Sequence, residues 1–301
     1  MIRKLVILFK LGRKIANSDI LNIVSKFKEP PLAIKILFKI LSFSFSPKKQ
    51  IDLNKDEGER LSDSLESMGT TFIKLGQFLA TRPDIIGEEL SKRLENLQDK
   101  LPPFSLLQAK EIIKNDLGNE CYNSIINLSE PVAAASIAQV HKAQINDNGV
   151  LKDVAIKILR PNIKKIFNEE IDAMMLFAFL IESFIKKTKR LKLVEVVFLL
   201  KEITNLEMDL RFEAAAANEL FENTKNDIGF IVPKIYWNYT TKKILTLDEV
   251  KGVSIREYKK LKEYGVDLKK LAENLIQHFL KQAVRDGFFH GDMHQGNLFV
   301  D

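Results

Sequence analysis

Near the start of the chain, apolar residues recur every three or four positions, which is the period of a helix. In residues 1–16 this stripe consists of Leu5, Leu8, Leu11 and Ile15. After Pro30-Pro31 a second stripe consists of Ile34, Leu37, Phe38 and Leu41. Lysine and arginine residues flank both stripes, so residues 1–50 are predicted to form a basic amphipathic arm. Such an arm either lies on a membrane or packs on the rest of the protein, and periodicity alone does not distinguish the two.

The next segments predict helices followed by a hairpin of strands. Helical spacing runs from residue 58 to about residue 101, and Pro83 divides it into at least two pieces. Two short runs with strand-like character follow, at 139–143 and 154–158. Asn148-Gly149 lies between them and is a typical turn signal, so the pair is predicted to form a β-hairpin.

The remaining pattern returns to helices and adds a second pair of strands. Residues 162–222 read as two helices, the second of which continues from residue 194 through the alanine run 214–217. Strands are predicted at 231–236 and 244–250. Asp267 is a suitable cap for a last helix that ends near Gly287.

The composition is that of a globular protein, since 46% of the 301 residues are hydrophobic and 29% are charged. Cys121 is the single cysteine, which excludes an internal disulfide and a thiolate metal cluster. The net charge of +6 is concentrated in residues 1–50, which hold eleven Lys and Arg but only Asp19 and Glu29 as acids. A basic arm on a near-neutral body favours contact with an anionic surface over binding of nucleic acid.

The chain contains no apolar run of about 18 residues, so we expect no membrane span. The apolar run at 5–9 is short and is followed by basic residues, so we also expect no cleaved leader.

The first chemical signal is Val154-Ala155-Ile156-Lys157, which places a lysine near the end of the second hairpin strand. This is the pattern of the kinase lysine that pairs with nucleotide phosphates. Taken alone, the same four residues also suit a solvated lysine on a strand.

The second signal is the segment 290–297, His-Gly-Asp-Met-His-Gln-Gly-Asn, which follows the last predicted helix. Asp292 and Asn297 are five residues apart, as in the kinase catalytic loop. In that loop the aspartate acts on the acceptor hydroxyl and the asparagine holds Mg²⁺. The alternative is a glycine-rich turn in which both residues have only structural roles.

Together with three further motifs, these signals resemble the UbiB-type atypical kinase-like family of ubiquinone biosynthesis. The motifs are Lys74-Leu75-Gly76-Gln77, the run Ala133 to His141 with its three alanines, and Glu207-Met208-Asp209 before Arg211-Phe212-Glu213-Ala214. They occur in the family order and the resemblance covers residues 60–301.

The resemblance implies an α+β, protein-kinase-like bilobal fold with an N-terminal helical extension and an incomplete C-terminal lobe. The expected parts are the membrane-proximal arm at 1–50, the helical extension at 51–130, an N-lobe with inserted helices at 131–252, and a partial C-lobe at 253–301.

The resemblance also assigns roles to individual residues. The expected catalytic residues are Asp292, Lys157 and Glu213, and the expected metal ligand is Asn297. Lys157 would also bind nucleotide, together with Ala133, Ala134, Ala135, Ser136, Glu249 and Val250. Regulation of the site is expected from Lys74, Gln77 and Glu207. On one continuous helix Glu207 and Glu213 would point about 120° apart, so one glutamate could not replace the other. The resemblance implies that Glu213 pairs with Lys157 and that Glu207 faces Lys74.

The alanine run stands where ordinary kinases have a glycine-rich loop, and its β-carbons keep the backbone from approaching phosphate as closely. The resemblance therefore implies altered handling of ATP or ADP with Mg²⁺. The sequence stops at Asp301, before the second metal-binding acid of kinases, and this predicts weak or absent phosphoryl transfer by this chain alone.

The implied function is an ATP-binding atypical kinase or ATPase that supports ubiquinone biosynthesis. The implied partners are an anionic membrane, polyprenyl lipid intermediates and ubiquinone-biosynthesis enzymes, with no nucleic acid and a homodimer left open. The implied location is peripheral, on the cytoplasmic face of a bacterial inner membrane. Two alternatives are a non-catalytic membrane scaffold and a small-molecule kinase of the aminoglycoside or choline type.

Overall fold

The computed structural model describes residues 57–94, 101–147, 149–184, 186–291, 293 and 295–301, together with 9, 12 and 13. Of the basic arm predicted at 1–50, the structure describes only residues 9, 12 and 13. The chain forms two compact units, and each is assembled from separate segments. The first unit comprises the chain up to Pro102, Ala134–Ile137 and Arg160–Met208, and the second comprises Pro103–Ala133, Ala138–Leu159 and Asp209–Asp301.

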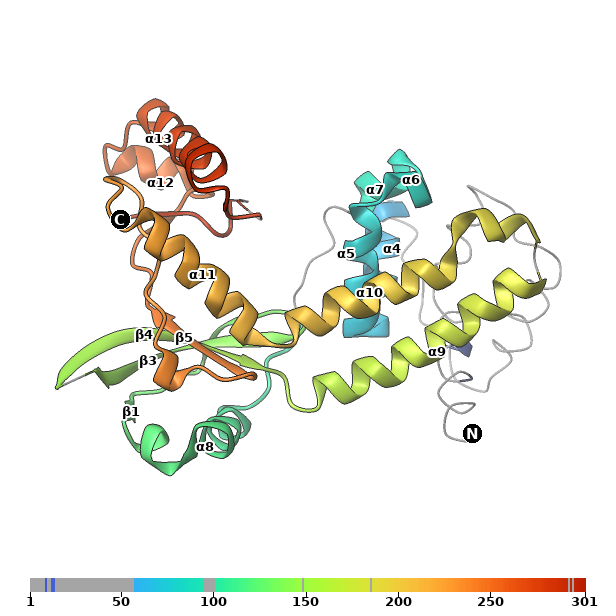
Figure 1. Ribbon diagram of the computed structural model, residues 1–301, viewed down its shortest axis with the longest axis horizontal. Helices are drawn as coiled ribbons and strands as arrows, with labels where there is room; N and C mark the ends of the chain where they lie inside the picture. The colour runs from blue at the N-terminus through green and yellow to red at the C-terminus, as the bar shows by residue number, and fades with distance from the viewer. Residues whose placement is uncertain are drawn as a thin grey trace. The chain divides into compact units, whose positions relative to one another are not determined.

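The described part of the first unit is helical. Its elements are α4 (Glu57–Met68), α5 (Thr70–Ala80), α6 (Pro83–Ile86), α7 (Glu88–Leu94), α9 (Ile163–Phe184), the short 3₁₀ helix η1 (Lys186–Leu191) and α10 (Leu193–Glu207). Pro83 begins α6 at its first position, where a missing N–H costs nothing, so the predicted break at this proline is confirmed. Helices α9 and α10 lie side by side and are joined by η1 (Figure 1). Phe167 and Ile171 of α9 and Leu200 of α10 are buried.

The second unit is built on an antiparallel sheet. Its strands are β1 (Ile125–Ile126), β2 (Pro131–Ala134), β3 (Ala138–Asp147), β4 (Val150–Leu159) and β5 (Ile244–Asp248), in the order β1-β3-β4-β5 with β2 also pairing with β3. The predicted hairpin is confirmed, because β3 and β4 pair from Ala138 opposite Leu159 to Asp147 opposite Val150. Gly149 in its turn has φ 86°, which suits glycine.

Alternation along β4 sends its side chains to two faces of the sheet. Val154, Ile156 and Ile158 are fully buried against Ala109 and Ile113 of helix α8 (Leu106–Asn123). Helix α11 (Leu210–Thr224) lies on the other face of the sheet (Figure 1). The odd-numbered residues of β4, which include Lys157, therefore face α11.

The end of the second unit has short strands and helices. Strands β6 (Val253–Ser254) and β7 (Phe299–Val300) pair antiparallel, and between them lie α12 (Tyr258–Glu263), α13 (Leu268–Leu280) and the π-helical turn η3 (Lys281–Asp286). Asp267 caps α13 as predicted, since its side chain accepts hydrogen bonds from the backbone N–H groups of Lys269 and Lys270.

Two predictions of secondary structure are wrong. Residues 231–236 do not form a strand, and only Ile235 makes an isolated bridge, to Leu247. The helix predicted to run from 194 through 217 is divided, because α10 ends at Glu207 and α11 begins at Leu210. Glu207 and Glu213 therefore lie on different helices, and the 120° calculated for one continuous helix does not apply.

Among the described residues, none of the helices combines the length and apolar character needed to cross a membrane.

Candidate active site

Lys157 and Glu213 form an ion pair in the second unit and are the centre of the candidate site. Lys157 points from β4 toward α11, and its Nζ lies 2.8 Å from Oε1 and 2.7 Å from Oε2 of Glu213. Glu213 stands in the first turn of α11. The two side chains retain 28% and 49% exposure, so the ammonium is held by a carboxylate and still accessible to a further anionic ligand. The pairing expected from the resemblance is present, and its role in nucleotide binding stays a prediction.

Asp209 fixes the start of the helix that carries Glu213. Its side chain accepts a hydrogen bond from the backbone N–H of Arg211 and makes two more with the Arg211 guanidinium, at 2.9 and 2.8 Å. These bonds to Arg211 lower the pKa of Asp209 from 3.8 to about 2. The backbone N–H of Leu210 donates to the carbonyl of Lys242, next to β5. The cap and this bond set the register of α11 beside the sheet.

The linker after β5 contains Glu249 and Val250. The backbone N–H of Glu249 donates to the carbonyl of Asp153, and its carboxylate lies 2.6 Å from Lys142 Nζ. Lys251 pairs with the Asp153 carboxylate at 2.6 Å, and this contact lowers the pKa of that carboxyl. The linker is thus tied to β3 and β4 on both sides of the exposed Val250.

Gly252 brings the linker against the strand that follows the catalytic-loop motif. Its φ is 151°, and a β-carbon there would lie 2.6 Å from the carbonyl oxygen of Val300. A second tie comes from Ser254, whose hydroxyl donates to the carbonyl of Gln295. The first contact places β7 against the linker, and the second joins the last part of the motif to β6.

The predicted catalytic-loop residues are only partly described. Asp292, the expected catalytic aspartate, lies outside the described residues, as does His294. Asn297, the expected metal ligand, is exposed just before β7. At the other end of the loop, the backbone N–H of His290 donates to the buried Gln282 carboxamide at 3.4 Å. Among the described residues there is no cluster of three or more His, Cys, Asp or Glu that could hold a metal ion, so the role of Asn297 stays a prediction.

The first unit contains the expected regulatory residues. Lys74 of α5 and Glu207, the last residue of α10, lie 2.8 Å apart, with side-chain exposures of 15% and 36%. The contact is an ion pair and lacks regular hydrogen-bond geometry at the Glu207 oxygen. Gln77 lies one turn after Lys74 on α5 and is half-buried. The Lys74–Glu207 contact expected from the resemblance is therefore present, whereas regulation by it stays a prediction.

The alanine run is divided between elements. Ala133 and Ala134 end β2, and Ala135 and Ser136 follow it as a loop. Within the first unit, the carbonyl of Ala135 accepts two hydrogen bonds from the Arg160 guanidinium, at 3.0 and 2.8 Å. The carbonyl of Ser136 accepts a third, from the Thr70 hydroxyl at the start of α5.

Sequence reasoning did not single out Arg160, although it holds this loop. Its guanidinium also donates to the carbonyls of Pro102 and Leu101, at 2.8 and 3.2 Å. The available signal was an arginine directly after the second hairpin strand and directly before Pro161. Arg211 belongs to a motif of the sequence, but the two residues between which its guanidinium bonds form, Asp209 and Arg211, are only two positions apart, and that spacing does not predict a bidentate bond.

Comparison with known proteins gives a consistent picture. The ABC1 atypical kinase-like domain matches residues 96–301. Probable protein kinases UbiB are similar to this chain over most of its length: that of Marinobacter nauticus is 38% identical over 274 residues, covering 91% of this chain and 49% of the relative. That of Azotobacter vinelandii is 36% identical over 277 residues, which cover 91% of this chain and 51% of the relative. That of Pseudomonas fluorescens is 32% identical over 294 residues, which cover 97% of this chain and 54% of the relative.

This chain thus spans about half the length of these relatives. A solved complex of Rv3197 with erythromycin, from Mycobacterium tuberculosis, is 26% identical and covers 75% of this chain and 56% of its own, with a TM-score of 0.47. The mixed sheet and helices, with a strand lysine paired to a helix glutamate, agree with the α+β kinase-like fold of the matched domain. The chain belongs to the ABC1 atypical kinase-like family, and within it to the UbiB type.

Proposed function

We propose that this chain is the nucleotide-binding part of an atypical kinase or ATPase that supports ubiquinone biosynthesis. The observation that carries the proposal is the Lys157–Glu213 pair, in which a strand lysine is oriented by a helix glutamate and remains partly exposed. Such a lysine donates to nucleotide phosphates in kinases. UbiB-named bacterial relatives support the same assignment.

The donor set suits a nucleotide in ATP or ADP form together with Mg²⁺. Lys157 would hold the phosphates, and Glu213 would keep its ammonium in place. The backbone at Glu249 and Val250 would hydrogen-bond to adenine, and Asn297 would bind the metal ion. Asp292 would orient or deprotonate the acceptor hydroxyl. The bound nucleotide would supply the phosphoryl group.

The alanine run gives the site its atypical character. A β-carbon at each of Ala133, Ala134 and Ala135 limits how closely the backbone approaches phosphate. Bonds from Arg160 to Ala135 further restrict this loop. We therefore expect Ala133 to Ser136 to alter how the site handles ATP and ADP, and we propose Lys74 and Gln77 of α5 as regulatory residues.

A lysine substitution tests the nucleotide site directly. Lys157→Met keeps the length of the side chain and removes its charge, and we expect the dissociation constant for Mg-ATP to rise at least ~10-fold, as loss of a charge-assisted hydrogen bond predicts. Lys152→Met is the matched control, because Lys152 is an exposed lysine on the same strand. Isothermal titration of the intact chain measures both, and equal affinities of the two variants would contradict the proposed site.

A second experiment separates chemistry from a scaffold. In a bacterium that depends on this gene for ubiquinone, Asp292→Asn should abolish ubiquinone production if phosphoryl chemistry is required. Full rescue by this variant would instead favour a non-catalytic scaffold.

The proposed setting is peripheral, at the cytoplasmic face of a bacterial inner membrane. The bacterial origin of the relatives and the basic pattern of residues 1–50 support it. Anionic lipid, polyprenyl intermediates and ubiquinone-biosynthesis enzymes are the proposed partners.

A further inference from the structure

The turn between α9 and α10 carries a dense group of positive charges. Residues 186–192, here called the basic tip, have the sequence Lys-Lys-Thr-Lys-Arg-Leu-Lys and contain no acid. They form η1 and the residue that precedes α10. Lys189, Arg190 and Lys192 are exposed, and Lys192 keeps 65% of its side chain accessible. The tip therefore presents at least three accessible cations within four residues.

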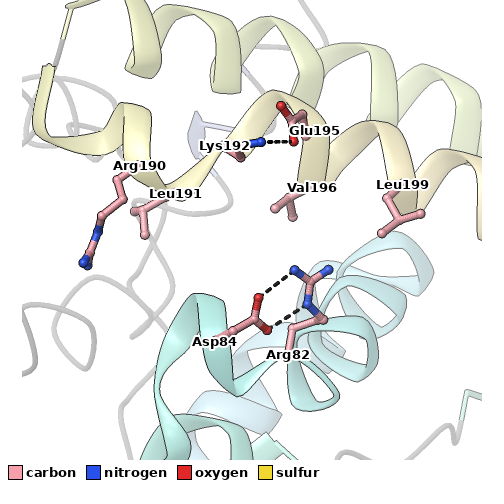
Figure 2. Close-up of a pocket in the computed structure, with 8 residues that line it drawn as sticks. All are labelled: Arg82, Asp84, Arg190, Leu191, Lys192, Glu195, Val196 and Leu199. Atoms are coloured by element: carbon pink, nitrogen blue, oxygen red, sulfur yellow. Dashed lines mark hydrogen bonds and ion pairs between the residues drawn. The ribbon is translucent and has the colours of Figure 1, made fainter.

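A pocket of about 320 Å³ adjoins the basic tip within the first unit. It is lined by Arg82, Asp84, Arg190, Leu191, Lys192, Glu195, Val196 and Leu199. In Figure 2, Leu191, Val196 and Leu199 extend from η1 and α10 toward the Arg82–Asp84 pair on the opposite side. The pocket therefore combines an apolar wall with charged groups, at a volume that suits a small polar headgroup.

The charges around this pocket are unevenly compensated. Arg82 forms a bidentate pair with Asp84, and Lys192 Nζ lies 2.9 Å from Glu195. Arg190 forms no ion pair with the residues that the structure describes. Its guanidinium points away from the Arg82–Asp84 ion pair (Figure 2). Arg190 is therefore the cation at this pocket without a paired acid in the described part of the chain, whereas Arg82 and Lys192 each pair with one carboxylate.

Exposed apolar side chains lie on both sides of the basic tip. Leu199 is 40% exposed on α10, and Phe179 is 59% exposed on α9. Phe179 also lines a second pocket, of about 410 Å³, with Leu176 and with Val194 next to the tip. Cations next to exposed leucine and phenylalanine are typical of helices that lie at a membrane interface.

We propose that the basic tip and the pocket beside it dock on an anionic lipid bilayer, with a lipid phosphate bound near Arg190 and Lys192. A free phosphate would use the cations but leave the exposed apolar residues in water, so the combination favours a lipid surface. The basic tip shares no residue with the arm at 1–50 or with the nucleotide site, and the proposal does not depend on either of them.

Cosedimentation of the full chain with vesicles tests the docking. The vesicles are phosphatidylcholine with or without phosphatidylglycerol, and no nucleotide is added. The triple change Lys189→Gln, Arg190→Gln and Lys192→Gln should lower binding to phosphatidylglycerol vesicles on the order of 100-fold, since each basic residue near an anionic surface contributes about fivefold. The matched control removes the same charge from exposed lysines of the second unit, as Lys259→Gln, Lys262→Gln and Lys269→Gln. Equal losses in the two triple variants would overturn the proposal.

A second pair of variants should strengthen binding, which unfolding could not do. Glu195→Gln releases Lys192, whereas Glu222→Gln releases Lys225 from an equivalent exposed pair three residues apart in the second unit. We expect Glu195→Gln to raise binding about fivefold and Glu222→Gln to change it little. No gain from Glu195→Gln would contradict a lipid phosphate at Lys192.

The apolar contribution separates a bilayer from a free anion. Leu199→Ser should lower vesicle binding about fivefold, while Leu107→Ser, at an exposed leucine of α8, should not. If Leu199→Ser has no effect and inorganic phosphate displaces the wild-type chain from vesicles, the tip is a site for free anions and the lipid proposal is wrong. Because titration with Mg-ATP is a separate assay, failure here leaves the nucleotide site untouched.

Discussion

Gly252 occupies a position where backbone geometry and space both exclude a side chain. Its φ of 151° is rarely adopted by other residues, and a β-carbon would come within 2.6 Å of the Val300 carbonyl oxygen. Gly252→Ala should therefore lower the free energy of unfolding by about 2 kcal/mol or more. Gly265→Ala is the control, because Gly265 has φ 77° but open space around it, and we expect a loss of about 1 kcal/mol. Urea denaturation of both variants measures the difference, and equal losses would show that the contact with Val300 is not tight.

Asp209 links the charge of a single carboxylate to the position of Glu213. Its pKa in the folded chain is about 2, below the ordinary value of 3.8, because Arg211 stabilises the ionised form. A carboxyl with a lowered pKa stabilises the fold above pH 4, and this contribution is lost as the pH falls from about 4 to 2. Asp209→Asn should therefore cost about 2 kcal/mol at pH 7 and little at pH 2.

The measurement is the unfolding free energy of wild type and Asp209→Asn across this pH range. Asp267→Asn serves as the control, because Asp267 caps α13 through two backbone N–H groups and forms no ion pair within the described part of the chain. Asparagine is about as good a cap as aspartate, so this variant should stay close to wild type. A constant difference between wild type and Asp209→Asn at every pH would rule out the charge of Asp209 as the cause.

At the scale of elements, one arginine holds the loop that contains the alanine run. Arg160 donates to the carbonyls of Ala135, Pro102 and Leu101, and methionine in its place would leave these acceptors without that donor. We expect Arg160→Met to speed amide hydrogen exchange in residues 134–137 while α13 exchanges as in wild type. Arg256→Met, at an exposed arginine of the second unit, is the control. Unchanged exchange at 134–137 would show that the loop is held by other contacts.

Elements with strong local signals could be predicted from the sequence, and those set by tertiary contacts could not. The short run at 154–158 and the turn signal Asn148-Gly149 indicated the strand that contains the buried Val154, Ile156 and Ile158, and Asp267 indicated the start of α13. The division between α10 and α11 was missed, because the apolar and alanine-rich pattern continues across it and the capping of α11 depends on Arg211. Residues 231–236 have strand-like composition, but they meet β5 through a single bridge.

At the scale of the whole molecule, the candidate site depends on residues far apart in the chain. Lys157 and Glu213 are 56 residues apart, and no spacing rule connects them. Their pairing was predicted only because several motifs together resembled a known family, and the geometry then agreed with it. Arg160 and the basic tip belong to no such motif, so the sequence analysis passed over both. Family resemblance thus located the Lys157–Glu213 pair, whereas the contacts of Arg160 and the exposure of the basic tip became evident only in the structure.

Nucleotide binding should be visible as a change in stability of the intact chain. A ligand that binds only the folded state stabilises it by about 2.7 kcal/mol at a hundred times its dissociation constant. We therefore expect saturating Mg-ATP to raise the melting temperature of wild type and of Lys152→Met, and to have little effect on Lys157→Met at the same concentration. Glu213→Gln should give an intermediate shift, because the lysine charge remains but loses the carboxylate that orients it. A scan of all four proteins with and without Mg-ATP checks this order, and an equal rise in Lys157→Met and wild type would place the nucleotide elsewhere on the chain.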